Sequence, residues 1–302
     1  MLGEFIAFYW KMRGYPLERF PLGKDMRERV IIKWGGGLIT DKSSLCTPDL
    51  EILGHLAETV SNCQSHGIEV ILVHGAGSFG HLRSKHWRLN DGILPNEEFE
   101  NDDDCSSQLE AVAQVRNEML QLNEHVCKAL VKENLTPLVH PPHLWAKNTG
   151  TSFLGSLDRF LEQSSECIHV TFGDVVDVEG ERLFGILSGD DLVARLAIEL
   201  PLVKRLVFAI KGVDGLLRVP PEQADTNDLI EHWSPEIKFE GTHQSEIDVT
   251  GGIGLKAARG ASVASHGIEV IMVNGEISER VLGAMLGNPV RGTIVTGKNE
   301  IC

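Results

Sequence analysis

Two lysines flank a run of three glycines near the start of the chain, a pattern that suits the binding of phosphate groups. Residues 30–42 read Val-Ile-Ile-Lys-Trp-Gly-Gly-Gly-Leu-Ile-Thr-Asp-Lys, so Lys33 precedes the glycines and Lys42 follows them. Glycines let backbone N–H groups approach an anion with no Cβ in the way, and lysines neutralise its charge. The spacing differs from that of the P-loop, in which four residues separate a glycine from Gly-Lys-Ser/Thr. We therefore expect a phosphate site whose second half lies elsewhere in the chain.

A second glycine-rich segment follows an apolar run at residues 69–74. Residues 74–81 read His-Gly-Ala-Gly-Ser-Phe-Gly-His, which contains the G-x-G-x-x-G spacing of dinucleotide-binding proteins. That interpretation also requires a second strand ending in an acidic residue about twenty positions later, and residues 83–96 contain no apolar run. A tight turn without a ligand is the structural alternative. We favour a third interpretation, in which both glycine segments follow parallel strands and meet at the carboxyl edge of one sheet, where α/β proteins bind ligands.

Two further segments carry charge at the start of expected helices. Residues 248–256 read Asp-Val-Thr-Gly-Gly-Ile-Gly-Leu-Lys, which places Lys256 one turn into a helix whose N-terminus attracts phosphate. Residues 188–191 read Ser-Gly-Asp-Asp, and the two aspartates either cap a helix or hold lysine ammonium groups in place. His81 either donates a hydrogen bond to an anion or bonds its own turn, whereas His74, at a strand end, is expected to be structural.

These segments together indicate phosphoryl transfer, a reaction in which the protein mainly positions the reactants and neutralises their charge. A phosphate monoester is already partly a dianion near neutral pH, because its second pKa is about 6. It can therefore attack a γ-phosphorus without a general base, provided that lysines, backbone N–H groups and magnesium relieve the repulsion between the anions. An acceptor with an apolar tail also needs an apolar wall, for which the helix at 107–132 and Trp145, Phe153 and Leu154 are candidates.

Alternating apolar runs and helical periodicity predict an α/β fold. The expected strands are residues 30–33, 69–74, 137–139, 168–172, 206–210 and 268–273, and the expected helices are residues 48–67, 107–132, 190–200 and 254–266. This alternation favours a largely parallel sheet with helices on both faces. The weakest seam, at residues 180–188, could divide two lobes that share one continuous sheet.

Composition argues against several other functions. The formal net charge of −15 disfavours a nucleic-acid partner, and 42% hydrophobic with 24% charged residues is typical of a soluble globular protein. The six cysteines form no C-x-x-C pair, so we expect reduced structural thiols and neither a zinc site nor a dithiol motif. The apolar run at residues 5–10 is too short to span a membrane and lacks the basic flank of a secretory signal. We therefore expect a cytoplasmic protein with no membrane partner. The acidic residues 96–104 are expected to form a solvated loop.

The motifs, taken in order along residues 29–298, resemble those of the amino acid kinase superfamily, and within it those of the isopentenyl phosphate kinase family. The motifs that carry the resemblance are Ile-Lys-Trp-Gly-Gly-Gly…Thr-Asp-Lys, Val-His-Gly-Ala-Gly-Ser-Phe-Gly-His, Ser-Gly-Asp-Asp, Val-Asp-Gly and Asp-Val-Thr-Gly-Gly. The Gly-Ser-Phe-Gly-His segment discriminates within the superfamily. Members that phosphorylate carboxylates lack this histidine, while isopentenyl phosphate kinases and fosfomycin kinases have it.

The resemblance implies a three-layer αβα sandwich with a largely parallel central sheet, preceded by an N-terminal extension of residues 1–28. An N-lobe at about 29–185 would bind the phosphate acceptor, and a C-lobe at about 186–298 would bind the nucleotide. The implied reaction is ATP-dependent phosphorylation of isopentenyl phosphate to isopentenyl diphosphate by direct in-line transfer. Mg²⁺ would bridge the ATP phosphates without a metal site on the protein. The resemblance also implies a homodimer.

The resemblance assigns roles to individual positions. Catalytic roles fall on Lys33, Lys42, His81, Asp190 and Lys256, with Lys42 stabilising the transferring phosphoryl group and Asp190 orienting Lys33 and Lys42. ATP would be held by Lys33, Gly35, Gly36, Gly37, Ala76, Val213, Asp214, Gly215, Gly251, Gly252 and Lys256. The substrate monophosphate would be held by Gly75, Gly80 and His81, with Gly173 on the same side.

The chain departs from the family pattern on the nucleotide side, where the usual Thr-Asp-Val-Asp-Gly reads Lys-Gly-Val-Asp-Gly at residues 211–215. Two alternative functions stay open. One is a kinase of the same fold that acts on a phosphonate such as fosfomycin or on another alkyl monophosphate, and a short polar pocket would favour it. The other is a non-catalytic nucleotide-binding regulator, against which the presence of Lys33, Lys42 and Lys256 argues.

Overall fold

The computed structural model describes residues 27–41, 44–95, 99, 104–161, 167–237 and 252–297. Its strands are β1 (Arg29–Trp34), β2 (Glu69–His74), β3 (Thr136–Val139), β4 (Cys167–Phe172), β5 (Asp174–Val178), β6 (Leu183–Leu187), β7 (Val203–Ile210), β8 (His232–Trp233), β9 (Glu269–Asn274) and β10 (Thr293–Val295). Its helices are α2 (Gly36–Ile39), α3 (Leu50–Ser65), α4 (His81–His86), α5 (Gln108–Lys132), α6 (Gly189–Glu199), α7 (Gly252–Ala264) and α8 (Ser278–Leu286). Each strand and helix expected from the sequence is present, within a few residues of its expected bounds.

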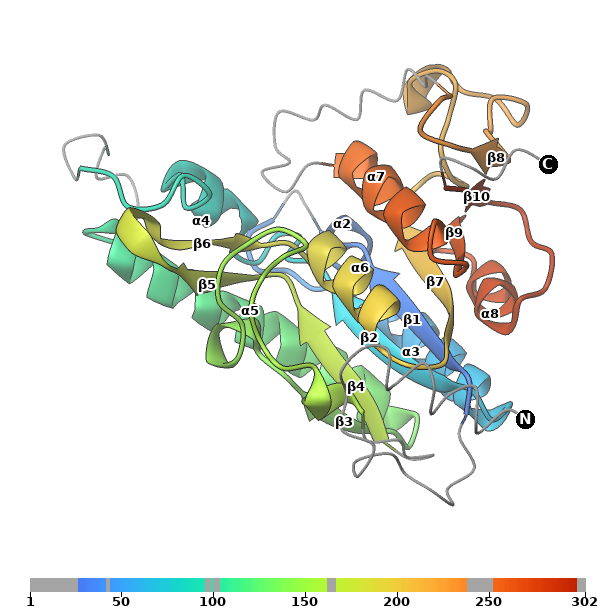
Figure 1. The fold of residues 1–302 in the computed structure, drawn as a ribbon, viewed down its shortest axis with the longest axis horizontal. Coiled ribbons are helices and arrows are strands. Elements are labelled where there is room, and N and C mark those ends of the chain that lie inside the picture. The colour runs from blue at the N-terminus through green and yellow to red at the C-terminus, as the bar shows by residue number, and fades with distance from the viewer. Residues whose placement is uncertain are drawn as a thin grey trace.

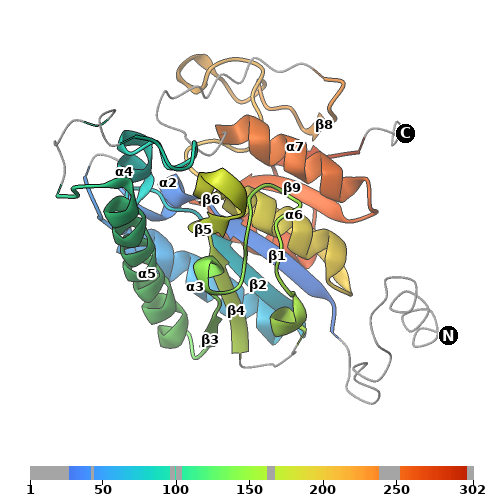
Figure 2. The same cartoon turned by 60° about the vertical axis from the view of Figure 1, so that its left-hand side comes forward.

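Eight strands form the central sheet, in the order β3-β4-β2-β1-β7-β9-β10-β8 (Figure 1). The strands from β3 to β9 in this order are mutually parallel, and β10 pairs antiparallel with β9. Figure 2 shows α3 and α5 on one side of the sheet and α6 and α7 on the other. The fold is therefore the expected three-layer αβα sandwich with a largely parallel sheet.

Apolar residues on both faces of the central strands hold the three layers together. Val30 and Ile32 of β1 are fully buried in the core cluster that includes residues of α3 and α5. Ile31, between them, is fully buried in the cluster that includes residues of α6 and α7. Consecutive side chains of a strand point to opposite faces, so a strand buried on both faces reads as a continuous apolar run. Ser107 caps the long helix α5 as predicted, since its hydroxyl accepts a hydrogen bond from the Glu110 N–H at 3.3 Å.

Several elements are not expected from the sequence, namely α2, α4, α8, β8, β10 and an antiparallel hairpin of β5 and β6 that forms a separate two-stranded sheet. This hairpin occupies the stretch suggested as a seam between lobes. Arg116 of α5 donates from Nε to the Val175 carbonyl at 2.8 Å and from Nη2 to Asp177 at 2.8 Å. These bonds hold the hairpin against α5. At its turn, Gly180 has a φ of +83°, a left-handed conformation that favours glycine.

Several expectations fall on residues outside the described ranges, namely the N-terminal extension up to residue 26, most of the acidic stretch, Lys42, Gly251 and Cys302. The five cysteines within the described ranges are all free. Burial raises the pKa of Cys63 to about 12 and that of Cys127 to about 11, so both thiols stay protonated at neutral pH. Of the helices that the structure describes, none has the length and apolar character needed to cross a membrane.

Candidate active site

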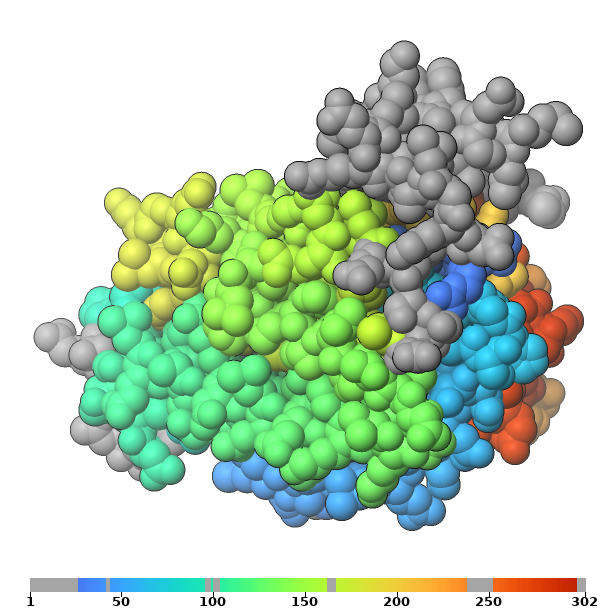
Figure 3. Space-filling model, turned by 90° about the horizontal axis from the view of Figure 1, so that it is seen from below, coloured from blue at the N-terminus to red at the C-terminus, as the bar shows by residue number. Residues whose placement is uncertain are grey.

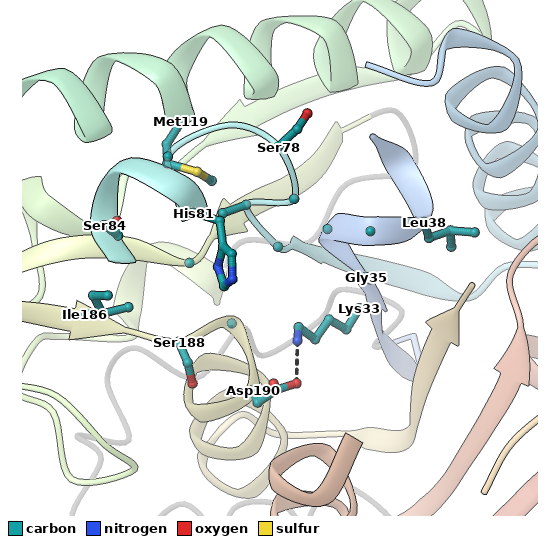
Figure 4. Close-up of a pocket in the computed structure, with 18 of the residues that line it drawn as sticks. Lys33, Gly35, Leu38, Ser78, His81, Ser84, Met119, Ile186, Ser188 and Asp190 are labelled. Atoms are coloured by element: carbon teal, nitrogen blue, oxygen red, sulfur yellow. Dashed lines mark hydrogen bonds and ion pairs between the residues drawn. The ribbon is translucent and has the colours of Figure 1, made fainter. Parts of the chain in front are cut away.

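A cavity of about 250 Å³ opens at the carboxyl ends of β1, β2, β4 and β7. Figure 4 shows Lys33 of β1, His81 of α4 and Asp190 of α6 directed into it. Most of the positions to which the sequence assigns a role line this cavity: Lys33, Gly35, Gly36, Gly37, Gly75, Ala76, Gly80, His81, Gly173, Asp190, Val213 and Lys256. Gly252, the first residue of α7, is buried next to the lining. The two glycine segments therefore meet at one edge of the sheet, as the parallel topology requires.

One buried carboxylate holds two lysines of the cavity. Asp190 is 1% exposed, its Oδ1 accepts from the Lys33 ammonium group, and its Oδ2 lies 3.4 Å from Lys256 Nζ. Burial alone would raise the pKa of Asp190, but the charges of Lys256 and Lys33 outweigh burial and hold the pKa below its ordinary value. Asp190 is therefore ionised at neutral pH and fixes both ammonium groups. The sequence prediction paired Asp190 with Lys33 and Lys42, and the structure places Lys256 as the second lysine in contact.

A neighbouring serine caps the helix that carries Asp190, which resolves the two interpretations of the aspartate pair. The Ser188 hydroxyl accepts a hydrogen bond from the Asp191 N–H at 3.1 Å and so caps α6. The Asp191 carboxylate accepts from the Ser188 hydroxyl at 2.8 Å and from Arg259 Nε at 2.7 Å. Asp191 thus ties α6 to α7, while Asp190 faces the cavity and its lysines.

The two glycine segments pack backbone against backbone. A Cβ added at Gly36 would lie 2.2 Å from the Gly77 nitrogen, and one added at Gly75 would lie 2.7 Å from the Gly36 nitrogen. The same contact is fastened by Thr40, whose Oγ1 donates to the Gly36 carbonyl at 2.8 Å and accepts from the Ser78 N–H at 2.9 Å. Glycine is therefore required here for contact between the two turns as well as for access to an anion.

Some backbone N–H groups beside the cavity are not used by the hydrogen bonds of the sheet. Gly35 and Gly75 continue the sheet, since their N–H groups donate to the carbonyls of Ala209 and Trp34, each at 3.0 Å. Among the described residues, the N–H groups of Gly36, Gly37, Ala76 and Gly77 donate no hydrogen bond. Successive N–H groups at a glycine turn and at the start of a helix form an anion-binding concavity. With the adjacent lysines they can hold phosphate oxygens.

His81 is the first residue of α4 and lies on the cavity side of that helix (Figure 4). Gly80 precedes it with a φ of 74°, a left-handed conformation that turns the chain into the helix. A largely buried ion pair between Arg83 Nε and Glu118 Oε1, 2.9 Å long, holds α4 on α5. The imidazole is therefore carried on an anchored helix and extends toward the side of the cavity where Asp190 lies.

An apolar wall lines the part of the cavity next to His81. It consists of Val115 and Met119 from α5 and of Val175 and Ile186 from the β5–β6 hairpin. Figure 4 shows Ile186 on the side of His81 away from Lys33. The stripe of α5 does supply part of an apolar wall, as one interpretation of the sequence suggested. The contribution of the hairpin carries no sequence signal, because the hairpin itself is not predicted.

The other candidates for this wall lie elsewhere, so that prediction is wrong. Trp145, Phe153 and Leu154 are absent from the residues that line the cavity. Phe153 is 1% exposed in the core that α6 covers, and the Arg195 guanidinium lies 4.4 Å from its ring centroid. Leu154 is half exposed to solvent. Large aromatic side chains are also needed to fill the core, and the sequence does not distinguish that use from a binding pocket.

Of the three positions expected at the base and ribose of the nucleotide, only Val213 lines the cavity. The Asp214 carboxylate is held by the guanidinium groups of Arg280 and Arg291, with 2.5 Å between its Oδ2 and Arg291 Nε. Gly215 packs closely against β10. Asp214 and Gly215 therefore support the turn that presents Val213 and do not themselves reach the cavity.

His74, at the end of β2, is fully buried outside the cavity, as a structural histidine would be. Its Nε2 lies 3.2 Å from Asn123 Oδ1, and its ring stacks on that of Phe172 with 5.0 Å between centroids. Burial lowers the pKa of His74 to about 4, although hydrogen bonds to Gly75 and Asn123 oppose the shift. The imidazole is therefore neutral in the folded protein at every pH at which an assay would be run.

We expect the protein to lose stability as the pH falls from 7 to 5. The unfolded chain protonates His74 near pH 6.5 and the folded chain only near pH 4, so acid favours the unfolded state throughout this interval. Linkage makes the loss about 2 kcal/mol at pH 5 for this residue. Urea unfolding at both pH values measures it, and His74→Gln should show a smaller pH dependence than the parent. Equal dependence in the two proteins would contradict the burial argument.

The sequence matches the amino acid kinase family over residues 28–274, and the chain belongs to that family. It is 30% identical to the isopentenyl phosphate kinase of Methanothermobacter thermautotrophicus over 279 residues, which cover 89% of this chain and 100% of the relative. It is 29% identical to the isopentenyl phosphate kinase of Thermoplasma acidophilum, over 83% of this chain and 94% of the relative. A solved structure described as isopentenyl phosphate kinase superposes with a TM-score of 0.70 at 28% identity, covering 89% of this chain and all of the other.

Proposed function

We propose that this chain transfers the γ-phosphoryl group of ATP to isopentenyl phosphate, giving isopentenyl diphosphate and ADP. The observation that carries the proposal is one cavity in which two carboxylate-held lysines, two glycine turns, a histidine and an apolar wall meet. Relatives named isopentenyl phosphate kinase, similar over most of both chains, support the choice of substrate.

The residues of the cavity supply the charge neutralisation and positioning that this reaction needs. The acceptor phosphate is itself the nucleophile, since a monoester with a second pKa of about 6 is largely a dianion at neutral pH. Lys33 and Lys256, together with the glycine-turn N–H groups, would hold the ATP phosphates, and His81 would hold the acceptor phosphate in line with the γ-phosphorus. Lys42 is proposed to stabilise the transferring group, and Gly251 to join the β- and γ-phosphate contacts.

The apolar wall favours isopentenyl phosphate over a phosphonate such as fosfomycin. Val115, Met119, Val175 and Ile186 offer aliphatic surface next to His81, which is where the tail of a bound monophosphate would extend. Burying an aliphatic tail against such a wall contributes about 25 cal/mol for each Å² removed from water. A short polar acceptor gains little of this.

Mg²⁺ is proposed to be held by the nucleotide and not by a cage of protein ligands. Among the described residues no group of three or more His, Cys, Asp or Glu side chains could hold a metal ion, and the Asp190 carboxylate is taken by its two lysines. Mg²⁺ is commonly bound through substrate phosphates and water. When bound, it would add to the neutralisation of charge on the phosphate oxygens.

We propose that residues 29–185 form the acceptor lobe and residues 186–298 the nucleotide lobe. His81 and the apolar wall support the first, and Val213 and Lys256 support the second, although the boundary falls within the β5–β6 hairpin. Figure 3 shows segments coloured blue to yellow-green over most of one face and orange to red segments gathered at its right-hand edge. From the family resemblance we also propose a cytoplasmic homodimer, which light scattering after size-exclusion chromatography would test.

His81→Ala should lower kcat/KM for isopentenyl phosphate by several tens-fold, within a range of about 10- to 150-fold. The imidazole would donate a charge-assisted hydrogen bond to the acceptor phosphate, and losing such a bond costs roughly 1.5–3 kcal/mol. The measurement is kcat/KM for isopentenyl phosphate. The matched control is His86→Ala, which removes an exposed histidine from the other end of α4. An unchanged kcat/KM in His81→Ala would remove His81 from the site.

ADP release with Mg-ATP and three acceptors, compared side by side, tests the proposed function. The acceptors are isopentenyl phosphate, dimethylallyl phosphate and fosfomycin. We expect a strong preference for isopentenyl phosphate. Turnover of fosfomycin alone would replace the acceptor and keep the kinase chemistry. Tight ATP binding without turnover of any monophosphate would favour the regulator.

A further inference from the structure

Lys211 is a third cationic side chain on the cavity lining described above, and the reaction as derived makes no use of it. It directly follows β7, at the sheet edge where the cavity opens. Unlike Lys33 and Lys256, it forms no ion pair with any residue within the described ranges, and its side chain is exposed. A lysine on a cavity wall without a protein counterion is available to a ligand anion.

The backbone on both sides of Lys211 is held in place. The Ile210 carbonyl accepts from the Gly275 N–H at 2.8 Å, and the Gly212 N–H donates to Glu276 Oε2 at 3.0 Å. Gly212 has a φ of +75°, which lets the chain turn immediately after the lysine. Of the two acidic residues at this turn, Glu276 accepts from the Gly212 N–H and Asp214 is paired with Arg280 and Arg291. The side chain of Lys211 is therefore presented from a fixed point on the rim.

The described charged groups inside the cavity offset only a small part of the charge of two phosphorylated ligands, so Lys211 would add to the proposed contributions of Lys42 and Mg²⁺. Lys33 and Lys256 share the single negative charge of Asp190, so the three groups together contribute a net charge of only +1. A nucleoside triphosphate and a monophosphate bring several negative charges into the same space. Val213, the position assigned to the nucleotide, lines the cavity two residues after Lys211. The lysine therefore lies on the proposed nucleotide side.

We propose that the Lys211 ammonium group binds the phosphate chain of the nucleotide. The protein would therefore bind nucleoside di- and triphosphates more tightly than nucleoside monophosphates. The proposal rests on the proposed function in that the nucleotide is taken to be a substrate. Because the lysine is exposed, its attraction for phosphate is partly screened by solvent and salt. Its contribution therefore falls on nucleotide affinity and KM, while kcat at saturating ATP depends on the buried lysines.

The test measures binding of ATP, ADP and AMP by calorimetry without any acceptor, for the parent and for Lys211→Met. The matched control is Lys204→Met, which removes an exposed lysine from the opposite end of β7. We expect Lys211→Met to weaken ATP and ADP binding about five- to tenfold and AMP binding less than twofold, and the loss to shrink at high salt. Lys204→Met should bind all three nucleotides like the parent.

Two results would overturn the proposal. Equal weakening of AMP, ADP and ATP would place Lys211 at the base or ribose, and unchanged binding of all three would remove it from the site. Failure of the proposed function is separate. A parent protein that binds ATP with the expected dependence on Lys211 but phosphorylates no monophosphate would sustain the lysine assignment and refute the acceptor.

Discussion

Asp190→Asn is expected to lower kcat/KM for the phosphorylation of isopentenyl phosphate by about a hundred- to thousandfold. The carboxylate is buried and compensates both Lys33 and Lys256. Removing one partner from a buried ion pair costs roughly 3–5 kcal/mol, since it leaves charge uncompensated in a poorly hydrated place. Here the two lysines would repel each other, and either proton loss or displacement of one of them would spoil the ATP phosphate site. Steady-state kinetics of the purified variant measure the effect.

The adjacent aspartate offers a matched control for this experiment. Asp191→Asn keeps the same helix and changes a carboxylate that binds Arg259 away from the cavity, so we expect less than a fivefold change in kcat/KM. The pKa of Asp190 is held below its ordinary value, so its charge is complete well below neutral pH. The parent's activity should therefore show no titration of this group between pH 6 and 9. Nearly normal kinetics in a folded Asp190→Asn protein would refute the role given to the carboxylate.

Gly36→Ala is expected to lower kcat/KM about a hundredfold or more, and to reduce the melting temperature as well. The added Cβ would lie 2.2 Å from the Gly77 nitrogen and 2.9 Å from the Ala76 nitrogen, which are backbone atoms that cannot rotate away. The two turns would have to separate by about 1 Å to restore ordinary contact, and misplacement of that size can cost about 10²-fold in rate. Kinetics and thermal unfolding of the same sample separate the loss of rate from the loss of fold.

A glycine elsewhere in the chain controls for the substitution itself. Gly54 lies inside α3 with nothing within 4 Å of an added Cβ. Gly54→Ala should leave kinetics unchanged and stabilise the protein by up to about 1 kcal/mol, because alanine favours a helix interior. If Gly36→Ala were as active as Gly54→Ala, the contact between the turns would have no part in the reaction.

The layers of the fold could be predicted because the central strands are buried on both faces. β1 and β2 are buried along their whole length, so the middle of each reads as a continuous apolar run, at residues 30–32 and 70–73. The β5–β6 hairpin could not be predicted in the same way. Its first strand begins at Asp174 and contains Asp177, whose carboxylate is needed by Arg116, and such interruptions hide a strand in the sequence. The apolar wall that this hairpin completes was hidden with it.

The sequence predicts those positions of the site that follow from the parallel order of the strands alone. Residues directly after β1 and β2 must share one sheet edge, which is why both glycine segments could be placed at the cavity, whereas Gly173 was placed from the family resemblance. The direct contact between the two turns depends on strand register, in which Trp34 lies beside His74. The choice of Lys256 as a partner of Asp190 depends on how α6 packs on α7. A local sequence motif predicts neither the packing of two helices nor the register of two strands.

Transfer of the γ-phosphoryl group to isopentenyl phosphate is tested most directly by a ³¹P NMR time course of the purified protein with Mg-ATP and isopentenyl phosphate. We expect the monophosphate signal to disappear while the two coupled signals of a diphosphate ester grow, with ADP formed in equal amount. Inorganic phosphate should not accumulate, because the acceptor phosphate and not water attacks the γ-phosphorus. ATP consumed to inorganic phosphate with the monophosphate left intact, or no change in either compound, would contradict transfer of a phosphoryl group within this cavity.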